Sequence, residues 1–218
     1  MNDFRLDWGR EARTGVAEAV LCEPKTPAQI AAILAEAVEN SGRLLLTRLA
    51  PEQHDALPAP LRGLLDFDPL SRTAILGGSP SGVPVEGTLI LAAGTADLGP
   101  AREAARTLDF HGRAAPLIAD VGVAGLWRLN QQLDRLRAAR VIIVAAGMEG
   151  ALFSVVAGLV SAPVIALPTS VGYGVAAGGT VALHAALSSC ASGVMAVNID
   201  NGFGAATAAI KILEAGRR

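Results

Sequence analysis

Residues Val141–Pro168 read VIIVAAGMEGALFSVVAGLVSAPVIALP, and this segment decides the fold class. It divides into an apolar run (VIIVAAG), a stretch of small residues long enough for a helix, and a second apolar run (PVIALP). Parallel strands that are covered on both faces form continuous apolar runs of this kind. A membrane span is the alternative that the length allows. However, Glu149, two prolines and several glycines interrupt the segment, which favours a buried strand–helix–strand unit.

The same alternation continues on both sides of this segment. Five short apolar strands that alternate with helices predict an open, doubly wound α/β sheet, class α/β. The strands are expected at residues 88–93, 114–119, 141–146, 163–167 and 194–199, and the helices at 100–111, 124–138, 148–160, 176–189 and 204–214.

A smaller α/β unit is expected ahead of this sheet. Thr26 is a plausible N-cap with Pro27 at the first helical position, and apolar residues then recur at helical spacing. Residues 18–22, 43–49 and 69–75 read as strands, and residues 51–65 as a short helix and turn. The segment GGSPSGVP, residues 77–84, is the expected linker. We therefore predict a domain over residues 1–80 and a second over residues 85–218.

Composition excludes some classes of function. The net charge of −2 gives no electrostatic case for nucleic acid binding. Two cysteines far apart in the sequence, with no secretory signal before them, predict free thiols in a reducing cytoplasm. The high content of alanine and glycine indicates close backbone packing and extensive subunit contacts. We expect a cytoplasmic protein with no membrane segment.

Polar and glycine-rich loops follow the predicted strands. Ligands of doubly wound sheets bind at the carboxyl ends of the strands, so these loops should meet at one edge. They are AAGTADLG (92–99), DVGVAG (120–125), AGMEG (146–150), LPTSVGYG (167–174) and NIDNGFG (198–204).

Residues 190–205 read CASGVMAVNIDNGFGA and place a thiol, a carboxylate and amides around the last strand. No Asp, Glu, Lys or Arg occurs from Gly150 to Ile199, so Cys190 and Asp200 bracket the end of an uncharged segment. We expect Cys190 to lie near the ligand edge, although a free cysteine is usually a small buried hydrophobe. Cys22 has no polar neighbours in the sequence and is expected to be structural.

Glu149 stands in an apolar strand–helix junction. We expect it to be shielded from water, which suits a general acid or base. Its alternative role is to complement the helix dipole. Residues 94–97 (GTAD) offer backbone N–H groups and a hydroxyl to a phosphate or ribose, and a capped helix start is the equally good alternative. The hydroxyls of Thr169, Ser170 and Tyr173 could likewise bind a phosphate or carboxylate, and a purely structural role in the loop is an equally good explanation.

Other polar groups carry weaker signals. The three histidines are scattered without the spacing of metal ligands. Lys25 and Arg48 follow strand-like runs, and Arg5, Arg10 and Arg13 recur near Asp7. These cations predict either a solvated face or a clamp for an anionic ligand.

Taken together, these residues resemble the LarB family, which takes part in synthesis of the nickel-pincer nucleotide cofactor. The resemblance runs nearly from end to end. It rests on DFRLDWGREARTG (3–15), PKTPAQI (24–30), LLTR (45–48), AAGTADL (92–98), DVGVAGLWRL (120–129), AGMEGAL (146–152), VVAGLV (155–160), PVIALPTSVGYG (163–174) and SSCASGVMAVNIDNGFGAA (188–206).

The resemblance implies a fold and an activity. The C-terminal half of the family is similar to aminoimidazole ribonucleotide carboxylases, so it implies a flavodoxin-like three-layer αβα domain in an octamer. The implied reaction carboxylates nicotinic acid adenine dinucleotide with CO2 or bicarbonate and hydrolyses its phosphoanhydride. The products would be AMP and pyridinium-3,5-biscarboxylic acid mononucleotide. No prosthetic group is implied.

The resemblance also implies roles for residues. Cys190 matches the family's nucleophile, and we assign proton handling to Glu149, with Asp200 or Asp97 as alternatives. Mg²⁺ is expected at the substrate phosphates, held through Asp97 or Asp200. The expected substrate-binding residues are Lys25, Arg48, Gly94, Thr95, Asp97, Gly122, Gly147, Met148, Thr169, Ser170, Tyr173, Asn198 and Asn201.

Two other functions compete with this one. An aminoimidazole ribonucleotide carboxylase or mutase also places CO2 on a ribosyl heterocycle, but it needs no cysteine and leaves the first 80 residues unexplained. A protein that binds the dinucleotide without turning it over is the non-enzymatic alternative, and the joint presence of Cys190, Glu149 and Asp200 argues against it.

Overall fold

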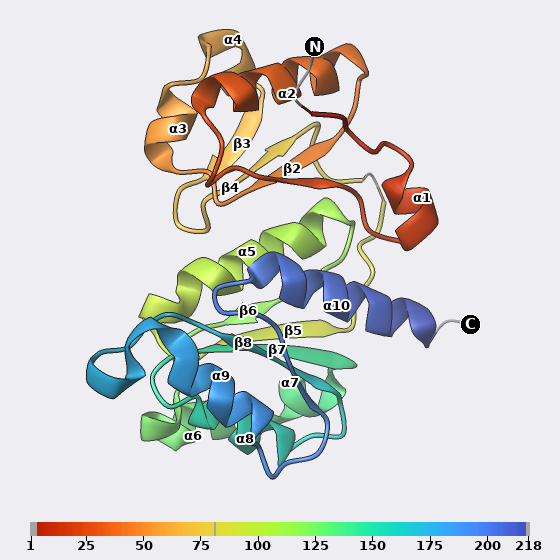
Figure 1. The fold of residues 1–218 in the computed structure, drawn as a ribbon. Helices are drawn as coiled ribbons and strands as arrows, with labels where there is room; N and C mark the ends of the chain where they lie inside the picture. The colour runs from red at the N-terminus through yellow and green to blue at the C-terminus, as the bar shows by residue number, and fades with distance from the viewer. Residues whose placement is uncertain (1–3, 81, 217–218) are drawn as a thin grey trace. The chain divides into compact units, whose positions relative to one another are not determined.

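A computed structural model describes residues 4–80 and 82–216 of the chain (Figure 1). The described chain forms two compact units, and the boundary between them in the sequence falls between Gly82 and Val83. This boundary lies inside the GGSPSGVP segment, where glycine and proline prevent a helix or strand from continuing. Each unit has its own sheet and its own buried core.

The first unit is a four-stranded mixed sheet with helices. Its strands have the order β1-β2-β4-β3, in which β1 and β2 are parallel and β4 is antiparallel to both neighbours. The strands are β1 (Ala19–Leu21), β2 (Leu44–Thr47), β3 (Leu65–Asp68) and β4 (Thr73–Leu76), and the helices are α1 (Arg10–Thr14), α2 (Pro27–Glu39), α3 (Pro51–Asp55) and α4 (Ala59–Arg62).

Helix α2 begins where the sequence predicts. The Thr26 hydroxyl accepts a hydrogen bond from Gln29 N at 3.3 Å, and the Gln29 amide oxygen accepts one from Thr26 N at 3.0 Å. This reciprocal capping box satisfies two backbone donors at the start of the helix. The apolar face of α2, which includes Ile30 and Leu34, is buried in the core of the unit.

Strand β3 corrects the expected order of elements in this unit. The sequence reading places only a helix and a turn over residues 51–65, and a strand over residues 69–75. The structure instead has a hairpin of β3 and β4, with Phe67 paired to Ala74. The β3 sequence is LDFD, and aspartate is depleted in strands, so propensity alone does not reveal this short edge strand.

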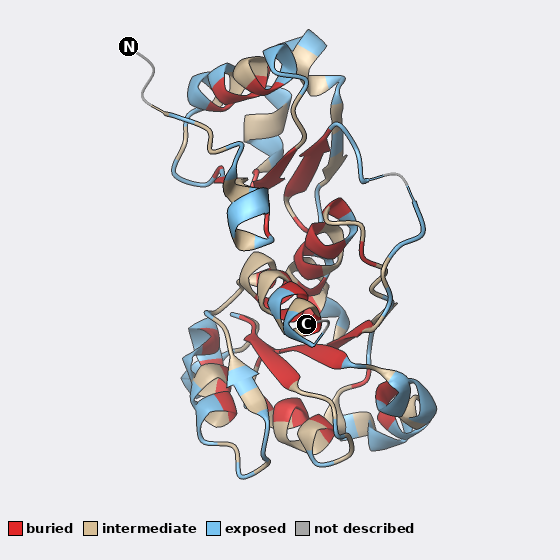
Figure 2. Cartoon of the chain, turned by 90° about the vertical axis from the view of Figure 1, so that its right-hand side faces the viewer, coloured by how far each residue is buried: buried red, intermediate tan, exposed pale blue. Residues whose placement is uncertain are grey.

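The second unit confirms the predicted α/β class and the flavodoxin-like arrangement. Its sheet has the order β6-β5-β7-β8-β9, and every pair is parallel. Strands β5, β7 and β8 are buried at every residue, as Figure 2 shows for the centre of the sheet. The strands are β5 (Thr88–Ala92), β6 (Leu117–Ile118), β7 (Val141–Ala146), β8 (Val164–Pro168) and β9 (Val194–Ala196).

Helices cover both faces of this sheet (Figure 1). Helices α5 and α10 pack on one face, and α6, α7, α8 and α9 lie on the other. Leu91 and Val144 point to the second face, and the side chains alternate along each strand. The helices are α5 (Leu98–Phe110), α6 (Leu126–Asn130), α7 (Leu133–Ala138), α8 (Ala151–Ala157), α9 (Thr180–Leu187) and α10 (Gly202–Ala215).

Two expectations about helices are settled in this unit. The single helix predicted over residues 124–138 is two helices, α6 and α7, and each buries one leucine, Leu129 and Leu136 respectively. The apolar segment Val141–Pro168 forms β7, α8 and β8. Within residues 4–80 and 82–216, helices that combine the length and the apolar character needed to cross a bilayer are absent.

Candidate functional site

Five loops meet at the carboxyl edge of the second sheet. Strand order reverses between β5 and β7, because the chain moves outward from β5 to β6 and then returns to the other side for β7. Doubly wound sheets bind their ligands in the crevice at this point. Most of the site residues predicted from the sequence lie in the loops after β5, β7, β8 and β9.

Asp97 and Thr169 join the loops after β5 and β8. The Thr169 hydroxyl donates to Asp97 Oδ1 at 2.5 Å, and Gly94 N donates to Asp97 Oδ2 at 2.8 Å. Asp97 is 4% exposed and Thr169 is fully buried. Both oxygens of the Asp97 carboxylate therefore accept hydrogen bonds from within the chain, and these bonds hold the loops after β5 and β8 together at the carboxyl edge.

Gly147 makes this link between loops possible. A Cβ at this position would lie 2.7 Å from the Thr169 hydroxyl and 2.1 Å from the Val171 carbonyl oxygen. Only a glycine lets the loop after β8 cross so close to the end of β7. Met148 N then donates to Val171 O at 2.7 Å and ties the same two loops again.

Asp200 fixes the loop after β9 to the loop after β8. Asp200 N donates to Pro168 O at 2.8 Å, and Ser170 N donates to Asp200 Oδ1 at 2.9 Å. Asn201 closes the same turn, because its side-chain oxygen accepts from Gly204 N at 2.8 Å and caps α10. The predicted residues Asp200, Ser170 and Asn201 are thus brought together.

Three residues other than glycine have positive φ at this edge. They are Asp120 (59°), Met148 (50°) and Asp200 (54°), and each follows a strand of the sheet. Such conformations are unfavourable for these residue types and concentrate at functional sites. Asp120 is not among the site residues predicted from the sequence, although its place directly after a predicted strand is a signal for it. Asp120 forms an ion pair with Arg128 at 2.5 Å.

The remaining residues of the predicted site differ in exposure. Gly122 N donates to Ala93 O at 2.8 Å and brings the loop after β6 to the end of β5. Tyr173 is 76% exposed. Thr95, Ser170 and Asn198 are also exposed, so their polar groups are open to a ligand.

Glu149 differs from its expected environment. It lies between Met148 and Gly150, directly before α8, at the carboxyl edge as predicted. However, its side chain is exposed rather than shielded from water in the single chain. The uncharged sequence around it belongs to the buried strand β7 and to α8, whereas Glu149 itself is exposed.

Cys190 corrects a second expectation. It lies after α9 and before β9, and a loop that joins a helix to the next parallel strand returns to the amino edge of the sheet. The ligand loops lie at the other end of the strands, the carboxyl edge. The thiol is exposed, and its neighbour Ser189 shares a hydrogen bond with Ser154 at 2.7 Å.

The first unit holds the other predicted cations. Lys25 Nζ donates to Leu21 O at 2.9 Å, and Arg48 pairs with Glu23 at 3.2 Å. Arg13 pairs with Asp7 at 2.5 Å and lowers the pKa of that carboxyl, although both groups are exposed. Cys22 is fully buried, and burial raises the pKa of its thiol to about 12, which agrees with a structural role.

The expected Mg²⁺ does not fit Asp97 as a direct ligand. Both oxygens of Asp97 already accept hydrogen bonds, and the residue is buried. Across the described ranges, groups of three or more His, Cys, Asp or Glu side chains that could enclose a metal ion are absent. Magnesium often keeps several waters and binds substrate phosphates, so Asp200 is the remaining protein candidate.

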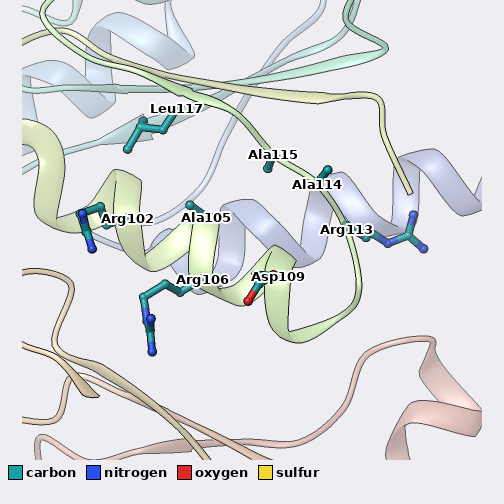
Figure 3. Close-up of a pocket in the computed structure, with 8 residues that line it drawn as sticks. All are labelled: Arg102, Ala105, Arg106, Asp109, Arg113, Ala114, Ala115 and Leu117. Atoms are coloured by element: carbon teal, nitrogen blue, oxygen red, sulfur yellow. The ribbon is translucent and has the colours of Figure 1, made fainter. Parts of the chain in front are cut away.

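A cavity of about 360 Å³ lies elsewhere on the second unit, between α5 and the segment that leads into β6. Figure 3 shows Arg102, Arg106 and Asp109 projecting from one side of α5, while Arg113 points away from them. The predicted site residues do not line this cavity. It is therefore separate from the carboxyl edge.

Comparisons with known proteins agree with this architecture. Residues 1–77 match the LarB/PurE-like N-terminal domain, and residues 88–218 match the AIR carboxylase family. The chain is also similar to the uncharacterized protein MJ0165 of Methanocaldococcus jannaschii. The two are 40% identical over 211 residues, which cover 93% of this chain and 80% of the relative.

Proposed function

Because the chain belongs to the LarB family and has a PurE-like C-terminal domain, we propose that it acts on nicotinic acid adenine dinucleotide. The enzyme carboxylates the pyridinium ring with CO2 and hydrolyses the phosphoanhydride. The products are pyridinium-3,5-biscarboxylic acid mononucleotide and AMP. The family matches support a carboxylase, and this substrate is our proposal. The observation that carries it is an exposed thiol, Cys190, in a chain whose first unit matches the LarB-type domain.

The chemistry explains why a thiol is needed. A pyridinium ring is poor in electrons, so its C5 carbon cannot attack CO2. Addition of the Cys190 thiolate to the neighbouring ring carbon breaks the aromaticity and leaves an enamine that is nucleophilic at C5. C5 then attacks CO2, a base removes the C5 proton, and expulsion of the sulfur restores the aromatic ring and the thiolate. An aminoimidazole ring is rich in electrons and needs no such step.

Glu149 and Asp200 supply the polar groups at the carboxyl edge. Glu149 is exposed beside the crevice and takes the C5 proton in this scheme. Asp200 is oriented by Ser170 N and contributes a carboxylate to the same edge. The two residues follow β7 and β9, which flank β8, so they face a common ligand.

A second copy of the chain supplies Cys190 to this edge. In one chain the thiol precedes β9 and Glu149 follows β7, so the two groups belong to opposite ends of the strands. The sequence from Gly150 to Ile199 has no charged residue, and Leu187 (69% exposed) and Met195 (42% exposed) leave apolar surface near Cys190. Exposed apolar surface of this kind favours contact between subunits. The octamer that the family resemblance implies is consistent with such contacts.

A product assay tests the activity. Purified protein is incubated with nicotinic acid adenine dinucleotide, Mg²⁺ and ¹³C-bicarbonate, and the products are analysed by mass spectrometry. We expect a labelled biscarboxylated mononucleotide and AMP. Cys190→Ala should abolish carboxylation, whereas Cys22→Ala, the matched change at the buried thiol, should retain it. Carboxylation of aminoimidazole ribonucleotide without consumption of the dinucleotide would instead establish the purine activity.

A mixing experiment tests the shared site. We expect Cys190→Ala and Glu149→Gln each to be inactive alone, and the two variants are unfolded together and refolded as mixed oligomers. If each site takes its thiol and its carboxylate from different copies, about a quarter of the sites regain both groups. If both groups come from one chain, no site regains activity. The recovered turnover therefore decides between the two arrangements.

A further inference from the structure

Two arginines lie at one edge of the first sheet in an unusual backbone conformation. Arg48 follows β2 and Arg72 precedes β4, and because these strands are antiparallel the two residues share an edge. Their φ angles are 51° and 54°, in the left-handed region that side-chain-bearing residues rarely adopt. Neither position has the short polar side chain that tolerates this region. Strained backbone of this kind concentrates at ligand sites, so the paired positions are a candidate for binding.

One carboxylate connects the two guanidinium groups. Glu23 Oε2 lies 3.2 Å from Arg48 Nη1, and Glu23 Oε1 lies 3.8 Å from Arg72 Nη2. Arg72 Nη2 also donates to the Arg48 carbonyl oxygen at 3.4 Å. Glu23 therefore holds both arginines side by side at the carboxyl end of β1 and β2.

The loop that carries Glu23 is itself anchored. The side-chain amide of Gln53 on α3 donates to Cys22 O at 3.0 Å and to Lys25 O at 2.7 Å. Lys25 lies two residues after Glu23 in the same loop, and Glu23, Lys25, Arg48 and Arg72 together carry a net charge of +2. The cluster is ordered before any ligand arrives.

Arg72 retains an unused donor in this cluster. Its Nε atom is buried, and within the part of the chain that the structure describes it donates to no acceptor. A buried donor without an acceptor is costly, and a ligand often supplies the missing acceptor. The Arg72 side chain is 42% exposed and the Arg48 side chain 34%, so a small anion can approach both.

We propose that Arg72, held beside Arg48 by Glu23, forms a binding site for a phosphate group in the first unit. Planar guanidinium groups bind phosphate oxygens through paired hydrogen bonds, and lysine adds a point charge. The assignment of this anion to the pyrophosphate of nicotinic acid adenine dinucleotide rests on the proposed function. Arg72 is not among the residues predicted from the sequence, because it lies inside the strand expected over residues 69–75.

Titration with inorganic pyrophosphate tests the site independently of turnover. Isothermal titration calorimetry of the full chain at low ionic strength should show binding that weakens at about 0.3 M salt. Arg72→Ala should weaken it about tenfold or more, because hydrogen bonds to a charged group are lost. Arg72→Lys should recover part of the affinity. Arg62→Ala, a change in α4 of the same unit, is the matched control and should leave the affinity unchanged.

Turnover of the dinucleotide separates the two proposals. If the protein is active, Arg72→Ala should raise KM with little change in kcat, since the lost contact binds substrate and transition state equally. Thermal unfolding confirms that each variant is folded. If pyrophosphate binding depends on Arg72 but the protein does not turn over the dinucleotide, the phosphate site is supported and the proposed function is rejected. Absence of pyrophosphate binding, or equal affinity of wild type and Arg72→Ala, would overturn the site even in an active enzyme.

Discussion

The hydrogen bond between Thr169 and Asp97 should stabilise the second unit measurably. The 2.5 Å bond joins a fully buried hydroxyl to a carboxylate that is 4% exposed, so water screens it little. Thr169→Val keeps the shape of the side chain and removes the donor. A hydrogen bond to a charged group contributes about 1.5–3 kcal/mol, and we expect the free energy of unfolding to fall by about 2 kcal/mol.

A double-mutant cycle isolates this bond. Asp97→Asn keeps the size of the side chain and removes its charge, and the double variant removes the charge and the hydroxyl together. We expect a coupling energy of about 1–2 kcal/mol between the two changes, because they share one contact. Residues that act independently would instead give additive effects.

Urea unfolding provides the measurement. The first unit contains Trp8 and the second contains Trp127, so a Trp8→Phe background lets Trp127 fluorescence follow the second unit. Linear extrapolation gives the free energy of unfolding for each member of the cycle. A coupling energy below about 0.5 kcal/mol would refute the conclusion that this bond ties the two loops together.

Three further outcomes are expected. Gly147→Ala should lower kcat/KM about tenfold or more in a folded protein, because the new Cβ lies 2.1 Å from Val171 O and displaces the loop after β8. Gly158→Ala is the control in the same kinetic assay. Its Cβ meets its nearest atom at 3.5 Å, so it should leave kcat/KM unchanged. At pH 8 a thiol reagent such as a disulfide should label one cysteine per folded chain, the exposed Cys190, and peptide mapping that finds the buried Cys22 modified first would contradict the structure. Burial raises the Cys22 pKa from 9.0 to about 12. The contribution of the neutral thiol to the free energy of unfolding is therefore fully present below pH 9 and is lost as the pH rises towards 12. The free energy of unfolding should fall by about 1.4 kcal/mol per pH unit in this window, and denaturant titrations should show a smaller slope for Cys22→Ala.

The sequence predicts the second unit well because its signals are local. Continuous apolar runs such as VIIVAA are typical of central parallel strands that are buried on both faces, and β7 has the predicted bounds. The N-cap at Thr26 is equally local, since the capping residues are adjacent in the chain. By contrast, β3 exists because it pairs with β4 in a hairpin, and its own sequence carries little strand preference.

The sequence by itself determined the α/β class, the loops that follow the strands and the residue types within them. Only the tertiary structure decided which of these residues meet. Asp97 and Thr169 are 72 residues apart and become hydrogen-bonded because their strands end at the same edge. Cys190 is ten positions from Asp200 yet lies at the opposite edge, because one strand of the sheet separates them. Proximity in a folded sheet depends on strand direction and order, and neither is encoded by the spacing of residues along the chain.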